Sequence, residues 1–344
     1  RQERAIAAAA PWVDRSDDEL WAMVPGQELP RTIYTNKGVI YQGQEPCCPG
    51  CGGEAPAKHG RTWWKFDDAR PWKVQCRNCA EIFPKNDFEA FYKSALDEQG
   101  MFRRKLGDRS LLFNAEHPDP KAPMHNLYVD DGYGMFDKDE RRHDIIAYYC
   151  QSALWWPIRK GVDALAHAYT LTNQRRYAHK AAVLLDRIAD VYPEMDYLPL
   201  HRLGFQHSQG GSGLGRIEGC IWETRVAQGF ARCYDVIFDG IQEDPDLVEF
   251  CSSKAEQYRL GEKRSVEAVC RHIEDHLLLE ALKSCKDGRI SGNTGMTHTC
   301  VAVNAISLDR PHATEEWLDW LFHPDFPGHG RGTRDSVPWV LTEG

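Results

Sequence analysis

The 344-residue sequence has no apolar run close to the twenty or so residues that a membrane-spanning helix needs. It also lacks an excess of basic residues, because 42 Lys and Arg face 51 Asp and Glu for a formal net charge of −9. The first residues, RQERAIAAAAPWVDR, do not form a charged and then apolar secretory leader. We therefore expect no membrane span. A global positive field for nucleic acid or anionic membranes is excluded, so an anionic ligand needs a local basic patch.

Aromatic residues, in contrast, are plentiful, with 11 Trp, 13 Tyr and 13 Phe. Aromatic faces stack on the apolar faces of sugar rings, but they also fill the cores of helical proteins, so composition does not choose between the two uses. The hydrophobic content of 42% is enough for a large core. This length favours one large helical domain with a small appendage.

Four cysteines have the spacing of two metal-binding knuckles. Four thiolates in two CxxC pairs close a tetrahedral Zn²⁺ site, and such a site is structural because no coordination position stays open. Cys47 is an alternative ligand to its neighbour, although only Cys48 keeps the two-residue spacing. Two disulfides in an oxidising compartment are the other interpretation. The predicted zinc ligands are Cys48, Cys51, Cys76 and Cys79.

The insert between the two cysteine pairs, residues 52–75, carries Trp63, Trp64 and Trp72 and is typical of a β-hairpin or two short strands. Basic residues near these aromatics form a modest patch of the kind that nucleic-acid-binding ribbons use. The module is a small part of the chain, however, and nothing downstream of it resembles a nucleic-acid-binding module. We therefore expect no nucleic-acid partner.

Most of the chain after residue 140 has apolar residues at spacings of three and four, which indicates amphipathic helices. Thr172 and Asn173 form a short link, so the helices on either side of it are expected to be antiparallel neighbours. An earlier short helix is expected to be capped by Ser16 or Asp17. The expected helices cover residues 15–24, 144–171, 174–192, 218–238, 246–256, 264–285, 296–308 and 314–322.

These elements predict a mainly α protein, an incomplete (α/α) toroid of helical hairpins with a small N-terminal β module that binds zinc through four cysteines. In such a ring the inner helices line a central cleft. The expected organisation is an N-terminal helix and extended segment at 1–46, a zinc-knuckle β module at 47–82, irregular connecting loops at 83–140 and the toroid at 141–344.

Residues 288–308, GRISGNTGMTHTCVAVNAISL, bring an amide and an imidazole to the start of one helix. The N-terminal N–H groups of a helix attract negative charge, and Asn293 or Thr294 is expected to cap this one. Asn293 and His298 are therefore candidates for chemistry on a bound anion. A capping Asn and a His whose hydrogen bonds are satisfied in the core explain the same residues.

A polar, Gly-rich loop, HRLGFQHSQGGSGLGRIEG, precedes the helix expected at 218–238. An arginine here can bind a carboxylate or sulfate through two parallel N–H groups, and a protonated Glu223 can donate a hydrogen bond to a bound anion. A solvated helix face is the alternative for Glu223 and Arg225, and turn chemistry is the alternative for Tyr133. The candidate substrate-binding residues are Gln206, His207, Arg216, Trp222, Glu223, Arg225 and Tyr133.

Several stretches resemble the heparinase II/III-like polysaccharide lyases, in which an N-terminal α/α toroid is joined to a C-terminal β-sandwich. The stretches are DDELWAMVPGQELPR, the CxxC pairs ending in CAEIFPKNDFEAFYKSALDEQGMF, ALAHAYTLTNQRRYAHKAAVLLDRIADVYP, IWETRVAQGFARCYDVI and GNTGMTHTCVAVNAISLD. The resemblance implies β-elimination on a uronic-acid-containing glycan, with heparin or heparan sulfate preferred as the anionic polysaccharide. It also implies a β-sandwich and a catalytic Tyr beyond Gly344. We expect a periplasmic or secreted bacterial protein.

In the chemistry that this resemblance implies, a base removes the C5 proton beside the uronate carboxylate and an acid protonates the departing O4. Asn293 matches the Asn that neutralises the carboxylate, and an amide does so without adding a charge that titrates. His298 is the nearby base or a second carboxylate contact, since neutral imidazole is accessible near its ordinary pKa of about 6.5. The Asn-Thr-Gly-Met-Thr-His order departs from the family pattern, in which a His follows the Asn more closely.

Other functions are compatible with the same residues. An alginate or ulvan lyase of the same fold is one alternative, and an (α/α) glycoside hydrolase or epimerase is another. A hydrolase needs two carboxylates that flank the glycosidic bond, whereas Glu218 and Glu223 are expected on different faces of one helix. A non-catalytic glycan-binding protein with a zinc-stabilised module is the third.

Overall fold

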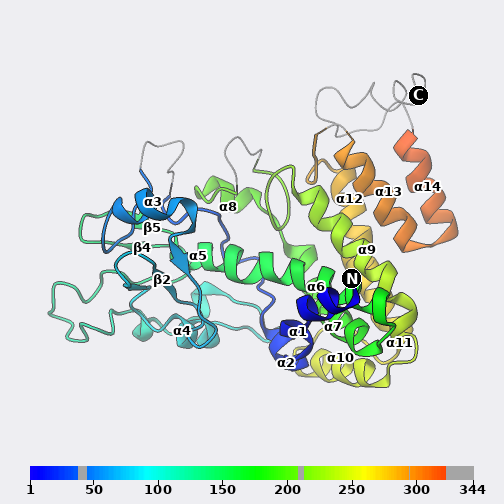
Figure 1. Ribbon diagram of the computed structural model, residues 1–344, viewed down its shortest axis with the longest axis horizontal. Helices are drawn as coiled ribbons and strands as arrows, with labels where there is room; N and C mark the ends of the chain where they lie inside the picture. Colours follow the sequence, from blue (N-terminus) through cyan, green and yellow to red (C-terminus); the bar gives the residue numbers. More distant parts are fainter. Residues whose placement is uncertain (38–44, 208–212, 294, 323–344) are drawn as a thin grey trace. The chain divides into compact units, whose positions relative to one another are not determined.

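The computed structural model describes residues 1–37, 45–207, 213–293 and 295–322. They form two compact units, which are described separately. The helical unit comprises Arg1–Val24, Trp156–Leu198 and Gly211–Gly344, and the mixed unit comprises Pro25–Trp155 and Pro199–Gly210. The chain is mainly helical with small antiparallel sheets, as the sequence predicts (Figure 1). The finer division into four segments stays a prediction. None of the described helices is both long and apolar enough to cross a membrane.

Helices of the helical unit pack against one another around α9. This helix contacts α6, α7 and α13, and α13 in turn contacts α12 and α14 (Figure 1). The bounds are α1 Gln2–Val13, α2 Asp17–Ala22, α6 Trp156–Thr172, α7 Arg175–Val191, η5 Tyr192–Glu194, α9 Glu223–Ile241, α10 Pro245–Gln257, α11 Val266–Ile273, η6 Glu274–Leu278, α12 Leu279–Lys286, α13 Met296–Leu308 and α14 Pro311–Phe322.

The hairpin of α6 and α7 confirms the periodicity found in the sequence. The two helices pack against each other on either side of the predicted link. Gly161 of α6 lies under the indole of Trp12 in α1, where an added Cβ would come within 2.4 Å of the ring, so only glycine allows this approach. The apolar positions of α7 are all buried, namely Tyr177, Ala181, Leu184, Leu185, Ile188 and Val191.

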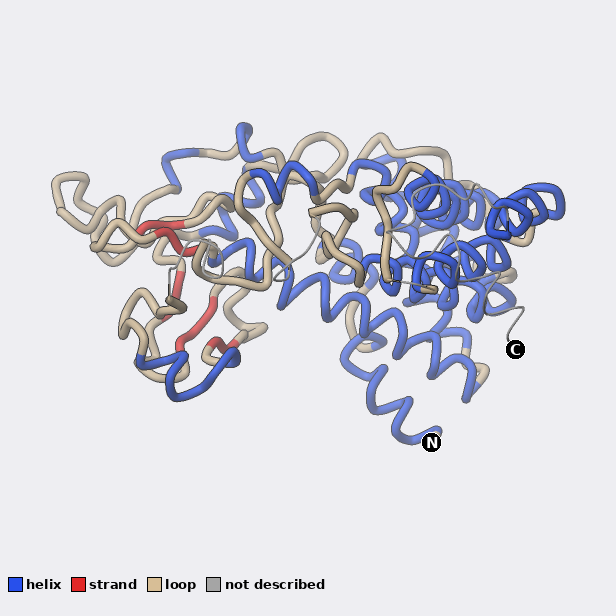
Figure 2. Tube along the Cα trace, turned by 90° about the horizontal axis from the view of Figure 1, so that it is seen from above, coloured by secondary structure: helices blue, strands red, loops and turns tan. Residues whose placement is uncertain are grey.

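The mixed unit holds both sheets, and Figure 2 shows its strands as short segments among loops. Strand β2 pairs antiparallel with β1 and β3, and β4 pairs antiparallel with β5. The bounds are α3 Glu54–His59, η1 Gly60–Thr62, β1 Trp64–Lys65, β2 Val74–Cys76, β3 Ile82–Phe83, α4 Phe88–Ser94, η2 Arg104–Leu106, η3 Arg109–Leu111, β4 Met135–Phe136, β5 Arg142–His143, α5 Ile145–Tyr149, η4 Cys150–Trp155 and α8 Leu198–Arg202.

Several expected elements differ in detail. The insert at 52–75 begins with α3 before its strands, and the helices expected at 144–171 and 264–285 each contain a π-helical segment. The helix expected from Glu218 begins at Glu223, because the Glu223 carboxylate accepts the N–H groups of Ile217 and Glu218 at 2.8 and 2.6 Å. These bonds hold the preceding residues in a loop.

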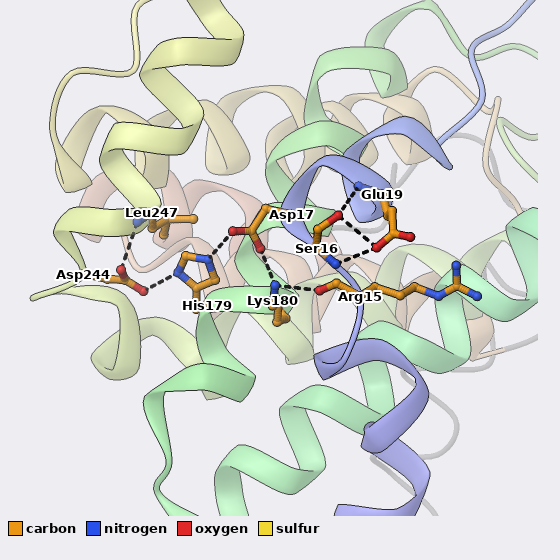
Figure 3. A network of polar contacts seen from close by, with 8 residues as sticks. All are labelled: Arg15, Ser16, Asp17, Glu19, His179, Lys180, Asp244 and Leu247. Atoms are coloured by element: carbon orange, nitrogen blue, oxygen red, sulfur yellow. Dashed lines mark hydrogen bonds and ion pairs between the residues drawn. The ribbon is translucent and has the colours of Figure 1, made fainter.

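A polar network ties α2 and α10 to α7 (Figure 3). His179 of α7 places Nε2 3.2 Å from Asp17 at the start of α2 and Nδ1 2.9 Å from Asp244, which caps α10. Lys180 donates a further hydrogen bond to Asp17 at 2.7 Å. Ser16, one of the two caps that the sequence predicts, caps α2 and forms a capping box with Glu19.

This arrangement makes stability depend on the charge of His179. Burial alone would lower the pKa of His179, but its hydrogen bonds to Asp17 and Asp244 outweigh burial and raise it to about 9. Because the folded pKa lies above the unfolded value of about 6.5, the stabilisation is complete below about pH 6.5 and is lost as the pH rises through 9. Burial raises the pKa of Asp17, yet hydrogen bonds from His179 and Lys180 lower it to about 2.

We predict that His179→Gln lowers the free energy of unfolding by about 2 kcal/mol at pH 6, and that most of this difference disappears at pH 9.5 to 10. Glutamine keeps hydrogen-bonding groups but removes the titrating charge. Urea unfolding of both proteins at the two pH values measures the effect. His167→Gln is the control, since His167 is an exposed histidine of α6. Equal destabilisation at both pH values would contradict the ionic account.

Candidate functional site

The two CxxC pairs meet in the mixed unit. The sulfur atoms of Cys48, Cys51, Cys76 and Cys79 all lie within 4.8 Å of one another. Sγ of Cys48 is 3.8 Å from that of Cys79, and Sγ of Cys51 is 3.9 Å from that of Cys76. Four sulfurs held at about 2.3 Å from a tetrahedral ion are about 3.8 Å apart. The cluster therefore has the dimensions of a metal site, and the structure holds its members as free thiols instead of disulfides.

Each knuckle turns its backbone N–H groups toward the sulfurs. The N–H of Gly50 lies 3.4 Å from the sulfur of Cys48, and the N–H of Asn78 lies 3.4 Å from that of Cys76. The residue after each pair, Gly52 or Ala80, has a left-handed backbone with φ near 63° or 62°. N–H groups directed at sulfur stabilise thiolate, the form that binds a metal. The donor set and its surroundings thus fit a metal ion.

Cys47 is not a member of this cluster. Its sulfur lies 3.2 Å from Nδ2 of Asn36 and 3.7 Å from Nη1 of Arg141. The structure therefore selects Cys48, and this confirms the spacing argument.

In the helical unit, the loop before α9 is held by two buried charged residues. Arg216 is fully buried and donates to the carbonyl oxygens of Tyr192, Pro193 and Met195 at 2.9 to 3.2 Å. It also pairs with Glu280. Glu223 is fully buried as well, which contradicts the alternative of a solvated helix face for this residue. The Arg216 guanidinium and the Glu223 carboxylate both make their hydrogen bonds within the protein, so substrate roles for them stay predictions.

The first turn of α9 presents an exposed aromatic and cationic pair. Trp222 is 40% exposed, and the Cζ atom of Arg225 lies 4.8 Å from the centre of its ring. Arg225 itself is exposed, so the alternative of a solvated helix face holds for this residue. A planar cation beside an exposed indole suits a ligand that has both an anionic group and an apolar ring face.

The turn that carries Asn293 packs against this same part of α9. An added Cβ on Gly292 would lie 3.1 Å from Cγ2 of Thr224, and Nε2 of Gln228 donates to the carbonyl of Met296 at 3.3 Å. The side chain of Asn293 is exposed. Sequence neighbours of Trp222 and Arg225 therefore contact sequence neighbours of Asn293, so the structure brings these candidates to one region.

The predicted cap of α13 is wrong for Asn293. The cap residue is Gly295, with a left-handed φ of 83°, and because glycine has no side chain it makes no side-chain cap hydrogen bond. Thr294 lies outside the described residues. His298 follows on α13 with 9% exposure, and burial lowers its pKa. The imidazole is therefore neutral near neutral pH, the form that a general base requires.

A basic cleft of about 320 Å³ lies between α6 and α9, beside this region. Lys160, Arg225 and Arg232 are exposed, and Arg159 is half-buried against Glu218. Most of this site could not be predicted from the apolar periodicity of residues 144–171, which concerns the buried face of the helix. The only signal in the sequence is that Arg159 and Lys160 lie about one helical turn after Trp156. The lining residues are Trp156, Arg159, Lys160, Asp163, Arg225, Val226, Gly229, Phe230, Arg232 and Cys233.

The remaining candidates belong to the mixed unit. The Cζ atom of Arg104 lies 4.5 Å from the ring centre of Tyr133, and burial raises the pKa of that tyrosine. The backbone carbonyl of Gln206 accepts a hydrogen bond from Oγ1 of Thr32 at 2.6 Å. His207 is buried. Substrate contacts by Tyr133, Gln206 and His207 stay predictions.

Comparisons with protein-family models, with curated proteins and with solved structures find no significant match. The class of protein therefore rests on the fold and on these two sites: a mainly helical protein with a four-cysteine cluster that can bind a metal ion and a separate basic cleft.

Proposed function

We propose that this protein binds an anionic, uronic-acid-containing polysaccharide in the basic cleft and cleaves it by β-elimination. The observation that carries the proposal is the cleft, in which three exposed cations and Arg159 face one carboxylate, Asp163. A chain of net charge −9 has no general affinity for polyanions, so a cleft with positive local charge indicates a specific anionic ligand. Carboxylates and sulfates along a glycan provide such anionic groups, and the exposed rings of Trp156 and Trp222 can stack on its sugar rings.

The chemistry assigned to the Asn293 turn follows from what its side chains can do. The exposed amide of Asn293 donates a hydrogen bond to the uronate carboxylate and lowers the cost of the enolate-like intermediate. Neutral His298 removes the C5 proton, the C4–O4 bond breaks with its electron pair on O4, and O4 takes a proton from water or an acidic side chain. Heparin or heparan sulfate is the preferred substrate, because sulfate esters add anionic groups for Arg225 and Lys160.

We further infer that the helical unit is part of an (α/α) toroid and that the ion in the cysteine cluster is a structural Zn²⁺. The toroid is supported by the α6–α7 hairpin and by the helices that pack in series around α9. Zinc is supported by the donor set of four thiols, which structural zinc prefers.

Incubation with uronic-acid polymers tests the lyase proposal, since each elimination creates an unsaturated end that absorbs ultraviolet light. We expect turnover of sulfated uronate glycans, and we expect Asn293→Ala to lower kcat at least about 100-fold, as losing a donor to a developing oxyanion does. The acid limb of the kcat/KM profile should lie below about pH 6.5, because burial lowers the pKa of His298.

Arg225→Ala should raise KM about tenfold and change kcat little, because it removes a charge-assisted contact that is made before reaction. Arg264→Ala is the matched control, since Arg264 is exposed and outside the cleft. No absorbance rise on any uronic-acid glycan would overturn the lyase proposal. Binding that Arg225→Ala weakens, without turnover, would favour the non-catalytic glycan-binding alternative instead.

A further inference from the structure

Two cysteines outside the metal cluster face each other in the core of the helical unit. Cys285 at the end of α12 and Cys300 in α13 are both fully buried, and their sulfurs are 3.8 Å apart. Each sulfur would move by only roughly 0.9 Å to reach the length of about 2.05 Å that a disulfide requires. The described residues place no third metal-ligating side chain with this pair, so a metal site does not explain it.

The chain between these cysteines is the turn that carries Asn293. It leaves α12 through Gly288 and enters α13 through Gly295, with left-handed φ values of 74° and 83°. Helices α12 and α13 pack against each other, so the two sulfurs lie where the turn is anchored. A left-handed glycine at each end gives the turn backbone freedom, and a covalent link at its base would restrict that freedom.

We propose that Cys285 and Cys300 are a redox-sensitive pair whose disulfide staples the 286–295 turn and restricts its opening. Asn304 already orients Cys300, since its Nδ2 donates to the Cys300 carbonyl at 2.8 Å and lies 3.6 Å from the sulfur. The contact with Cys285 and burial raise the pKa of Cys300 well above its ordinary value. Both sulfurs are fully buried, so neither meets an oxidant while the turn is closed. Reaction occurs when the turn opens locally.

The oxidant is a small disulfide of the glutathione class. The Cys285 thiolate attacks one sulfur of the reagent and releases one reagent thiolate. The Cys300 thiolate then attacks the Cys285 sulfur of the mixed disulfide and releases the second thiolate. Two protein thiols are oxidised to one disulfide, one reagent disulfide is reduced to two thiols, and the two protons pass to the reagent thiolates.

Peptide mass spectrometry of the zinc-loaded full chain tests the link. After treatment with oxidised glutathione, the protein is acid-quenched, unfolded, alkylated and digested. We expect the Cys285 and Cys300 peptides to be joined and two hydrogens lighter than their sum, whereas reduced glutathione leaves both alkylated. Cys251→Ser, which removes another buried cysteine, should leave the link intact. Free, alkylated Cys285 and Cys300 after oxidation would overturn the proposal.

Native trypsin cleavage after Lys286 and Arg289 tests the staple itself, and it does not depend on the glycan chemistry. Both sites lie between the two cysteines, and we expect oxidation to slow cleavage about tenfold because the closed form becomes more populated. Cys300→Ser should abolish the slowing, and Cys285→Ala serves if that variant does not fold. A disulfide that forms without changing the cleavage rate would overturn the restricting role.

Discussion

Cys76→Ser is expected to release the bound metal ion and to unfold the small sheet of the mixed unit. Cys76 lies in β2, the central strand of the sheet, so one side chain holds both the second knuckle and the strand that pairs with β1 and β3. Structural zinc contributes about 10 to 16 kcal/mol of apparent binding free energy in small zinc-dependent modules, and this becomes folding free energy. Losing one of four ligands should therefore cost several kcal/mol.

Elemental analysis measures whether the metal ion is lost. Tryptic digestion of the full chain measures whether the small sheet of the mixed unit unfolds. We expect about one zinc ion per chain in the native protein and far less in the variant, whose β1–β3 region should become sensitive to trypsin. Cys47→Ser is the matched control, because Cys47 is buried and adjacent to Cys48 in the sequence but lies outside the cluster. A Cys76→Ser protein that keeps its zinc, or a Cys47→Ser protein that loses it, would contradict the assigned ligand set.

Arg216→Met is expected to destabilise the helical unit by about 3 to 5 kcal/mol, the cost of breaking a buried ion pair from one side. Methionine fills part of the space but donates no hydrogen bond. The carbonyl oxygens of Tyr192, Pro193 and Met195 would lose the donor that they share, and the Glu280 carboxylate would lose its cation.

Urea unfolding measures this effect, with Arg225→Met as the matched control. Arg225→Met is the same substitution at an exposed position of the same region, so we expect it to lower the free energy of unfolding by less than about 1 kcal/mol. Adding Glu280→Gln to Arg216→Met should recover part of the loss, because the second change removes the unpaired negative charge. Equal effects of the two arginine substitutions would show that Arg216 does not hold the loop.

Features that depend on neighbouring residues could be predicted from the sequence. Ser16 caps α2, as one of the two expected caps, and α13 spans the expected residues 296–308. The CxxC spacing identified the four clustered cysteines for the same reason, since a tight turn brings each pair together locally.

The start of α9 shows where such local patterns stop being sufficient. Periodicity extends the helix back to Glu218, but the Glu223 carboxylate accepts backbone N–H groups from that segment and holds it as a loop. The polar members of α7 are a second case. The side chains of Asp186 and Asp190 are each only 1% exposed and pair with Lys263, which comes from a distant part of the sequence. An amphipathic pattern assigns such charged residues to solvent.

The sequence by itself determined the mainly helical composition, the α6–α7 hairpin and the members of the cysteine cluster, because hydrophobic periodicity and turn geometry act over a few residues. Only the tertiary structure decided which charges face solvent. Arg216 was turned inward by partners 64 and 68 residues away, whereas Arg225 was left beside Trp222 at the surface. The basic cleft likewise exists only because α6 and α9 pack together, which places Lys160 and Arg232 on one surface.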